Sequence, residues 1–417
     1  MTKLASMLLE RAADNRHGVT FETQMAVKSQ SDLKSLYHAG VPSSVLAPWE
    51  SASGGVSRNQ QSARLAAIGE SIERYSAATV QLPTFSFESA REHGANILDF
   101  SQWPLFTDDQ RVSEHFPFGA IYDKPTTYVQ VRSLADDRLV FVPQPLVVLR
   151  DDFETGLPTS SGLAAAPHAR AALLSALLEL VERDALMVTW LNGLAGHRIA
   201  LPETYADEVA SLNGIAYAFD ITPVYSPYPV IAVCGQIKKD GRPRFSLGVA
   251  CKTTLAEATE KAYHEWHQGV FFAGIFSEHA DTDHIATAVD VNTFDDHAVY
   301  YSLFPDQWDS LPLLQDMRIK KPRYDYPTKK PTVQNALKTL KIAFKRAAIR
   351  SYYVDVSGVD AFQSGVRVIR AVSPDLAMIF AHQSWPLLKH VDTFRKSRYP
   401  KNKPLVAFPN HMPHPLG

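Results

Sequence analysis

A threefold repeat of small residues followed by acidic pairs constrains this chain more than any other feature. The copies are Ser53-Gly54-Gly55 before Glu70 and Glu73, Ser161-Gly162 before Glu179 and Glu182, and Ser246-Leu247-Gly248 before Glu265 and Gln268. The intervals from glycine to first acid are nearly equal, and residues three apart lie on one side of a helix. Each copy therefore predicts a small Ser/Gly turn, a helix, and two oxygen-bearing side chains that point in one direction.

The residues around the second acidic pair predict that it is buried. Residues 169–187 are apolar on nearly every side before the acids, as expected of a buried helix. A buried carboxylate must be neutralised by protonation, by arginine or by a metal, and Mg²⁺ suits carboxylate oxygens. For any single copy, the alternative is a surface stripe of Glu–Arg ion pairs. Three copies at matched spacing favour one shared cation site.

Composition indicates an ordinary globular protein and excludes some partners. The 417 residues are 45% hydrophobic and 21% charged, with a net charge of −2, which leaves no electrostatic footprint for nucleic acid. The isolated Cys234 and Cys251 support neither a zinc knuckle nor a disulfide framework. No apolar run is long enough for a secretory signal or a membrane span, so we expect a cytoplasmic protein without a membrane partner.

Strand and helix patterns alternate along the chain. Helices are predicted at 62–80, 169–191 and 333–349, and strands near 128–131, 139–142, 230–233, 351–356 and 366–372. Paired strands beside helices predict a mixed α/β (α+β) fold with antiparallel-rich sheets. Because the three acidic helices are expected to share one site, we predict a single catalytic domain over 51–417. Residues 1–50 are expected to form a lead-in with a short helix and irregular chain.

Two proline-rich segments lie outside this pattern. The basic segment 318–331 predicts a solvated loop, or alternatively a contact for a partner or peptide. The tail 399–417 carries five prolines, and composition alone predicts that it is disordered.

Common nucleotide and hydrolase motifs are missing from the sequence. There is no G-x-x-x-x-G-K-[ST] loop, no G-x-G-x-x-G turn and no G-x-S-x-G elbow. The run from His264 to His267 is one residue short of the H-E-x-x-H zinc motif. A nucleotide, if bound, must therefore be held by another arrangement.

The acidic blocks resemble the YcaO family. The resemblance is carried by Ser53-Gly54-Gly55, Gly69-Glu70-Ser71-Ile72-Glu73-Arg74, Ser161-Gly162-Leu163-Ala164, Glu179-Leu180-Val181-Glu182-Arg183 and Glu265-Trp266-His267-Gln268. YcaO proteins are ATP-dependent enzymes that modify backbone amides of ribosomally made peptides. The resemblance implies a YcaO-type fold in which three acidic helices form one ATP and Mg²⁺ site.

The resemblance also assigns roles to individual residues. It implies that Glu70, Glu73, Glu179, Glu182 and Glu265 hold Mg²⁺, and that these residues bind ATP together with Ser161 and Gln268. Arg74, Arg183 and Arg370 would contact phosphate or orient the acids. Azoline-forming members often end in a proline-rich run whose terminal carboxylate, here that of Gly417, reaches the active site. This chain keeps Pro-His-Pro but finishes Leu-Gly.

The implied reaction is cyclodehydration of a precursor peptide. A Cys, Ser or Thr side chain attacks the preceding carbonyl, and transfer of the ATP γ-phosphate to the amide oxygen lets that oxygen leave as phosphate, which closes a thiazoline or oxazoline. Such a transfer needs mostly positioning and charge neutralisation, which metal-loaded carboxylates and arginines supply. The setting would be the biosynthesis of bacteriocin-type peptide antibiotics.

Partners and alternatives follow from the same resemblance. With only about 50 residues before the first motif, we expect a ThiF-like or leader-recognition protein to deliver the peptide. An FMN dehydrogenase that oxidises azolines is a further expected partner. The alternatives are backbone thioamidation with a TfuA-type partner, or a non-catalytic peptide-binding scaffold. The tail favours cyclodehydration over thioamidation, and five retained acids argue against a scaffold.

Overall fold

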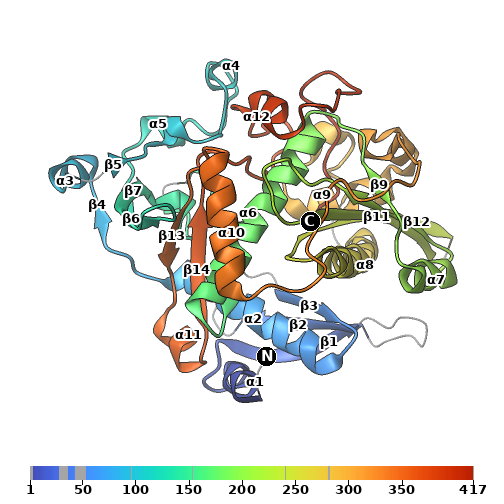
Figure 1. The fold of residues 1–417 in the computed structure, drawn as a ribbon, viewed down its shortest axis with the longest axis horizontal. Coiled ribbons are helices and arrows are strands. Elements are labelled where there is room, and N and C mark those ends of the chain that lie inside the picture. Colours follow the sequence, from blue (N-terminus) through green and yellow to red (C-terminus); the bar gives the residue numbers. More distant parts are fainter. Residues whose placement is uncertain are drawn as a thin grey trace. The chain divides into compact units, whose positions relative to one another are not determined.

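The computed structural model describes residues 3–27, 36–42, 53–94, 96–152, 154–239, 241–279 and 282–416 (Figure 1). The chain divides into two compact units, and neither is one continuous run of sequence. Unit 1 comprises Met1–Trp103, Asp108–Leu180 and Val333–Leu376; unit 2 comprises Pro104–Thr107, Val181–Thr332 and Ala377–Gly417. None of the helices in the described ranges combines the length and the apolar character needed to cross a membrane.

The first sheet of unit 1 precedes the first acidic helix. It is antiparallel, in the order β1 (Thr20–Val27), β2 (Leu36–Pro42) and β3 (Ser53–Ser57), and follows the short helix α1 (Lys3–Glu10). Helix α2 (Gln60–Thr79) packs on β3 and β2 (Figure 1). The short N-terminal helix is present as predicted. The prediction of irregular chain after it is wrong for the described residues, because two of these strands precede residue 50.

The second sheet of unit 1 contains most of the predicted strands. Its order is β5-β7-β6-β13-β14-β8, with β4 paired to β6, and all pairs except β5–β7 are antiparallel. The strands are β4 (Thr84–Phe85), β5 (Asn96–Ile97), β6 (Tyr128–Ser133), β7 (Leu139–Pro143), β8 (Leu163–Ala166), β13 (Tyr352–Asp355) and β14 (Arg367–Val372). The unit also contains α3 (Phe87–Glu92), η1 (Phe100–Gln102), α4 (Asp108–Arg111), α5 (Ala120–Asp123), η2 (Gln144–Leu146), α10 (Val333–Arg346) and α11 (Val359–Gln363). The predicted antiparallel-rich mixed fold is confirmed.

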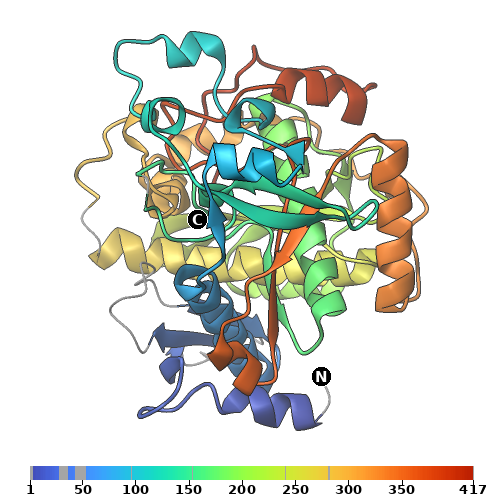
Figure 2. The same ribbon diagram turned by 90° about the vertical axis from the view of Figure 1, so that its left-hand side faces the viewer.

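Unit 2 is built on one antiparallel sheet of order β12-β11-β10-β9. The strands are β9 (Arg198–Ile199), β10 (Ile215–Asp220), β11 (Val230–Lys239) and β12 (Arg242–Cys251). Helix α8 (Leu255–His279) packs on β12 and β11, and α9 (Phe294–Leu303) packs on α8 and β12. Figure 2 shows α8 side-on as a long yellow helix. The unit also contains α7 (Glu203–Ser211), η3 (Ala288–Asp290), η4 (Pro305–Ser310), η5 (Pro312–Leu314) and α12 (Val391–Arg398).

Helix α6 (Ala169–Leu191) belongs to both units, with the division after Leu180. Its apolar residues are buried along most of its length, which agrees with a sequence that is apolar on nearly every side. Glu179 is therefore on the unit 1 part of this helix, and Glu182 is on the unit 2 part.

Two of the three predicted Ser/Gly turns are strands. Gly55 lies in β3 and Gly248 lies in β12, each directly under the helix that follows. A Cβ at Gly55 would come within 2.0 Å of the Ala63 carbonyl oxygen, and one at Gly248 within 2.1 Å of the Ala262 carbonyl oxygen. The glycines let strand and helix backbones touch. Only the second copy is a turn, in which Gly162 adopts φ +80°.

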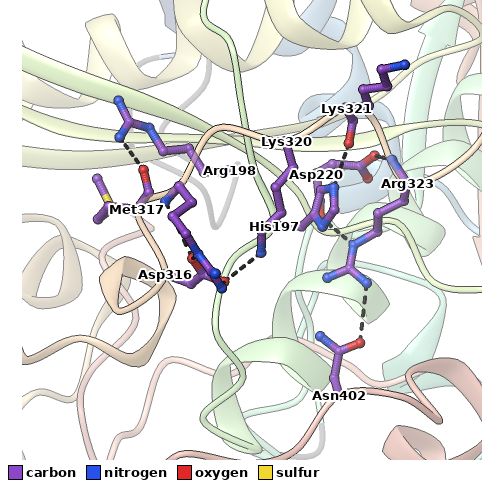
Figure 3. A network of polar contacts seen from close by, with 10 residues as sticks. His197, Arg198, Asp220, Asp316, Met317, Lys320, Lys321, Arg323 and Asn402 are labelled. Carbon is purple, nitrogen blue, oxygen red and sulfur yellow. Dashed lines mark hydrogen bonds and ion pairs between the residues drawn. The ribbon is translucent and has the colours of Figure 1, made fainter.

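The basic segment 318–331 is irregular but tied to the sheet of unit 2 (Figure 3). Asp220, the last residue of β10, accepts hydrogen bonds from the Arg323 amide and the Tyr326 hydroxyl, both at 2.8 Å. The His197 ring lies 2.7 Å from the Lys321 carbonyl oxygen. The segment is thus an exposed or half-exposed loop, as predicted, and it is also hydrogen-bonded to the sheet of unit 2.

The strand glycine of the first copy provides a stability test. We expect Gly55→Ala to lower the free energy of unfolding by about 2 kcal/mol or more, because the new methyl group meets backbone atoms that cannot move aside. Gly69→Ala, in α2, is the matched control: its Cβ meets nothing within 4 Å, and it should raise stability by about 1 kcal/mol. Urea unfolding of both variants would measure this, and equal changes would contradict the backbone contact.

Candidate functional site

The two acids of α2 are each fixed by a main-chain amide. Glu70 accepts a hydrogen bond from the Gly54 amide at 2.6 Å and pairs with Arg74 at 2.7 Å. Glu73, one turn later, accepts a hydrogen bond from the Ala165 amide of β8 at 3.0 Å. The carboxylates are therefore held by strand backbone rather than only by side chains of their own helix.

The first acid of α6 repeats the relation seen in the first copy. Glu179 accepts a hydrogen bond from the Gly162 amide at 3.2 Å, as Glu70 does from Gly54. A glycine amide before the helix thus meets the first acid of the helix in both copies. This contact explains the nearly equal spacing in the sequence. In the third copy, Glu265 forms an ion pair with Lys261 at 3.1 Å on α8.

The charges of unit 1 are not balanced around Glu73. The pKa of Glu73 is raised to about 8, first by burial and then by the neighbouring carboxylates of Glu179 and Glu70, against weaker opposing effects of Arg74 and the Ala165 amide. Three of the predicted acids therefore lie close enough to repel one another. Such a cluster favours either a bound proton or a bound cation.

Arg370, on β14, supplies part of the positive charge. Burial lowers the pKa of Arg370 to about 10, although the carboxylates of Glu179 and Glu73 act to raise it. Its Nε and Nη2 donate to the Leu146 carbonyl at 3.2 and 3.0 Å, and its Nη1 donates to the Thr159 carbonyl at 2.7 Å. Since a guanidinium has five N–H groups, two remain for other acceptors. The side chain thus orders two loops and faces the acids.

The second acid of α6 is held inside unit 2. Glu182 is buried, accepts a hydrogen bond from the Cys251 amide at 2.9 Å, and lies 3.4 Å from Nη1 of Arg183. The neighbouring Asp184, which the sequence analysis missed, is fully buried and paired with Arg398 at 2.9 Å. The only signal for Asp184 was an acid inside an apolar helix. Its partner comes from far along the chain.

The remaining predicted residues are partly exposed. Glu265 and Gln268 are three residues apart on α8, and Ser161 lies in the turn before β8. Glu70, Glu73, Arg74, Glu179 and Arg370 belong to unit 1, whereas Glu182, Arg183, Glu265 and Gln268 belong to unit 2. Convergence of the two sets on one site stays a prediction.

The chemistry of the acids fits Mg²⁺ and a nucleotide. Among the residues that the structure describes, no three His, Cys, Asp or Glu side chains are grouped closely enough to hold a metal alone. Mg²⁺ is usually bound by one or two carboxylates, with water and substrate phosphates completing the octahedron. The raised pKa of Glu73 marks a place where positive charge is lacking. The pairs therefore suit a cation that arrives with phosphate.

The C-terminal tail packs inside unit 2. Residues 413–416 are buried, and His414 is completely so. Burial lowers the pKa of His414, as do the neighbouring His297 and the positive charge of Arg183. The composition-based expectation of a disordered tail is wrong for these residues. Gly417, whose carboxylate was predicted to be catalytic, lies outside the described residues.

The charge cluster predicts how stability depends on pH. As pH rises above the ordinary glutamate value of 4.5, the unfolded chain loses its proton from Glu73 while the folded chain keeps it to about 8, so the free energy of unfolding falls across that window. Glu73→Gln removes this loss. We expect it to be more stable than wild type by on the order of 3 kcal/mol at high pH, and to match it near about pH 4.

Urea unfolding of metal-free protein across this pH range would measure the difference. Glu92→Gln is the control, because Glu92 is an exposed acid on α3 of the same unit. A stability difference between wild type and Glu73→Gln that does not change with pH would show that the carboxyl is not perturbed.

Comparisons with known proteins place this arrangement in a family. The family model described as YcaO cyclodehydratase, ATP- and Mg²⁺-binding, matches residues 54–377. Among solved structures, a heterocyclase in complex with substrate and cofactor is similar with a TM-score of 0.71 at 17% identity, over 90% of this chain and 52% of that chain. YcaO from Methanopyrus kandleri bound with AMPPCP and Mg²⁺ has a TM-score of 0.65 at 14% identity, over 90% of this chain and 91% of that chain.

A third relative is a subunit of an assembly. A chain of the E. coli microcin synthetase McbBCD complex has a TM-score of 0.64 at 17% identity, over 93% of this chain and 98% of that chain. The present chain spans about half the length of the heterocyclase, whereas it spans nearly all of the other two. A search of curated proteins gave no match. These similarities show a shared fold, and because the family model covers most of the sequence, the chain belongs to the YcaO family.

Proposed function

We propose that this chain is an ATP-dependent cyclodehydratase subunit that converts Cys, Ser or Thr of a ribosomal precursor peptide to thiazoline or oxazoline. The observation that carries the proposal is the cluster of Glu70, Glu73 and Glu179, each held by a strand or turn amide, in which burial and the neighbouring carboxylates raise the pKa of Glu73. The family to which the chain belongs is described as ATP- and Mg²⁺-binding, and a cluster of carboxylates is consistent with binding of Mg²⁺. A scaffold would gain nothing from mutually repelling, partly buried acids.

Some of the predicted residues are proposed to bind Mg²⁺ or the nucleotide, and others are proposed to orient the acids. Glu70, Glu73, Glu179, Glu182 and Glu265 are the proposed Mg²⁺ ligands, and Ser161 and Gln268 are proposed contacts of the nucleotide. Bound Mg²⁺ would supply charge neutralisation for the ATP phosphates. Arg74 holds Glu70, and Arg370 faces Glu73 and Glu179, so both orient acids as well as offering positive charge.

The peptide reaction requires a leaving group at an amide oxygen. The nucleophilic side chain of the peptide forms a bond to the preceding carbonyl carbon, and the amide oxygen, once phosphorylated, departs as phosphate. The amide nitrogen gives up its proton as the ring C=N bond forms. A base near the peptide is needed for these proton transfers. We propose the C-terminal carboxylate of Gly417 for this role, supported by the burial of tail residues 413–416.

A partner that delivers the peptide is part of the proposal. The McbBCD structure is by its description a complex, and a second one has pro-MccB17 bound. We propose that a ThiF-like or leader-recognition protein serves this chain in the same way, and that an FMN dehydrogenase oxidises the azolines afterwards. The setting would be the production of a bacteriocin-type peptide antibiotic.

ATP turnover tests the acidic site. We expect Glu179→Gln and Glu182→Gln each to reduce ATP hydrolysis by about a hundredfold or more, because both remove a charge that phosphoryl transfer needs. Glu260→Gln, an exposed acid on α8, is the control and should keep the wild-type rate. Release of phosphate would be measured for folded variants with equal thermal midpoints. Wild-type turnover by either site variant would exclude these acids from the site.

Product mass separates the candidate reactions. In the presence of ATP, a leader-binding partner and a precursor peptide, we expect the peptide to lose the mass of one water per ring. Without the partner, conversion should be much slower. Replacement of oxygen by sulfur in the peptide would instead support thioamidation, and ATP-independent peptide binding without any change of mass would support a scaffold.

A further inference from the structure

The backbone of the tail offers acceptors without matching donors. Pro409, Pro413 and Pro415 have no amide N–H, but their carbonyls remain. A buried segment of this kind cannot satisfy itself by pairing as a strand. It needs hydrogen-bond donors from side chains around it.

Four consecutive carbonyls of the tail meet such donors within unit 2. Gln383 Nε2 donates to the His411 carbonyl at 3.1 Å, Trp190 Nε1 to Met412 at 2.7 Å, and the Tyr301 hydroxyl to Pro413 at 2.6 Å. Nδ1 of His297 lies 2.9 Å from the carbonyl oxygen of His414. The four donor side chains come from α6, from α9 and from the segment before α12.

Helix α9 contributes two of the four donors from one face. His297 and Tyr301 are four residues apart, and each is at most 1% exposed. The His297 ring also stacks on the His414 ring, with centroids 3.8 Å apart and planes within 1°. Nε2 of His414 lies 2.8 Å from the Phe380 carbonyl oxygen. The tail is therefore held through both its backbone and its histidine side chain.

The position of the proton on His297 decides whether that residue holds the tail. Its Nε2 lies 2.8 Å from the Ala381 carbonyl oxygen, so both ring nitrogens face acceptors. Burial lowers the pKa of His297 to about 4, and a neutral imidazole has only one N–H. The tail carbonyl is bound when that proton is on Nδ1. An asparagine at this position could place an N–H near the same point.

We propose that Trp190, His297, Tyr301 and Gln383 form a socket that binds the tail carbonyls of residues 411–414 and thereby positions the C-terminal end. These are positioning residues, because they would act on the reaction through the tail that they contact. The socket itself follows from the contacts above. Its importance for ring formation rests on the proposed function. Arg183 is near enough to influence the His414 ring, and the terminal carboxylate follows His414 by three residues.

Two neighbouring tyrosines give a matched test of the socket. Tyr301→Phe removes the hydroxyl that bonds Pro413, whereas Tyr300→Phe removes the hydroxyl of an equally buried residue, which bonds Gln307 at 2.8 Å. We expect carboxypeptidase Y to trim the full chain about tenfold faster in Tyr301→Phe than in wild type. The reason is that the tail is released from the socket in a larger fraction of the molecules. Tyr300→Phe should be trimmed at the wild-type rate. Equal trimming of all three proteins would overturn the socket.

Substitutions at His297 separate donation from ring packing. His297→Phe keeps an aromatic ring but no donor, and His297→Asn keeps a donor near the Nδ1 position. We expect faster trimming in the first and partial rescue in the second. Trimming of His297→Asn as fast as that of His297→Phe would mean that the His297 donor does not hold the tail.

Ring formation tests the positioning role. For Tyr301→Phe we expect kcat for cyclised peptide to fall about tenfold while KM for ATP is unchanged, whereas general damage would alter both. Wild-type kcat in a variant whose tail is trimmed rapidly would overturn the positioning role. If wild type forms no rings with any peptide, the proposed function fails, and the trimming comparison still decides whether the socket exists.

Discussion

The hydrogen bond from a main-chain amide to a glutamate determines how four of the predicted acids of this protein are held. Gly54 donates to Glu70, Gly162 to Glu179, Ala165 to Glu73 and Cys251 to Glu182. Each bond gives a carboxylate a fixed direction without neutralising its charge. Directed donors stabilise the ionised form of a carboxylate, whereas neighbouring carboxylates destabilise it.

The arginines around these acids are not equivalent. Arg74 lies one helical turn after Glu70 and is partly exposed, so its ion pair contributes little stability. Arg370 is buried and bonded to two loop carbonyls, so its position is fixed by the fold. Because its position is fixed, the positive charge of Arg370 can oppose the repulsion between Glu73 and Glu179 without covering the two carboxylates. Removing it would leave buried carbonyls unsatisfied as well as unbalancing the acids.

Local sequence was sufficient for the long helices and for several strands, but not for the N-terminal strands or for the contacts between elements. The helices at Gln60–Thr79 and Ala169–Leu191 and the strands from Tyr128 and Leu139 agree with their periodicity. The sequence predicts turns at Gly55 and Gly248, because glycine usually marks turns. In fact they serve close packing of strand on helix, which no local pattern distinguishes. Asp220 binding Arg323, and Asp184 binding Arg398, join residues that are far apart in sequence, so composition could not reveal them.

Because the tail is held through its carbonyl groups, the structure constrains the length of the tail rather than its amino-acid composition. Four side chains meet four successive carbonyl oxygens, and every residue type presents such an oxygen at the same interval. Exchange of His411, which is exposed, would leave its carbonyl contact intact. Insertion or removal of one residue would shift every carbonyl out of register at once. The absence of amides at the prolines has a second effect, because it prevents the tail from adding as a strand to the edge of another molecule's sheet.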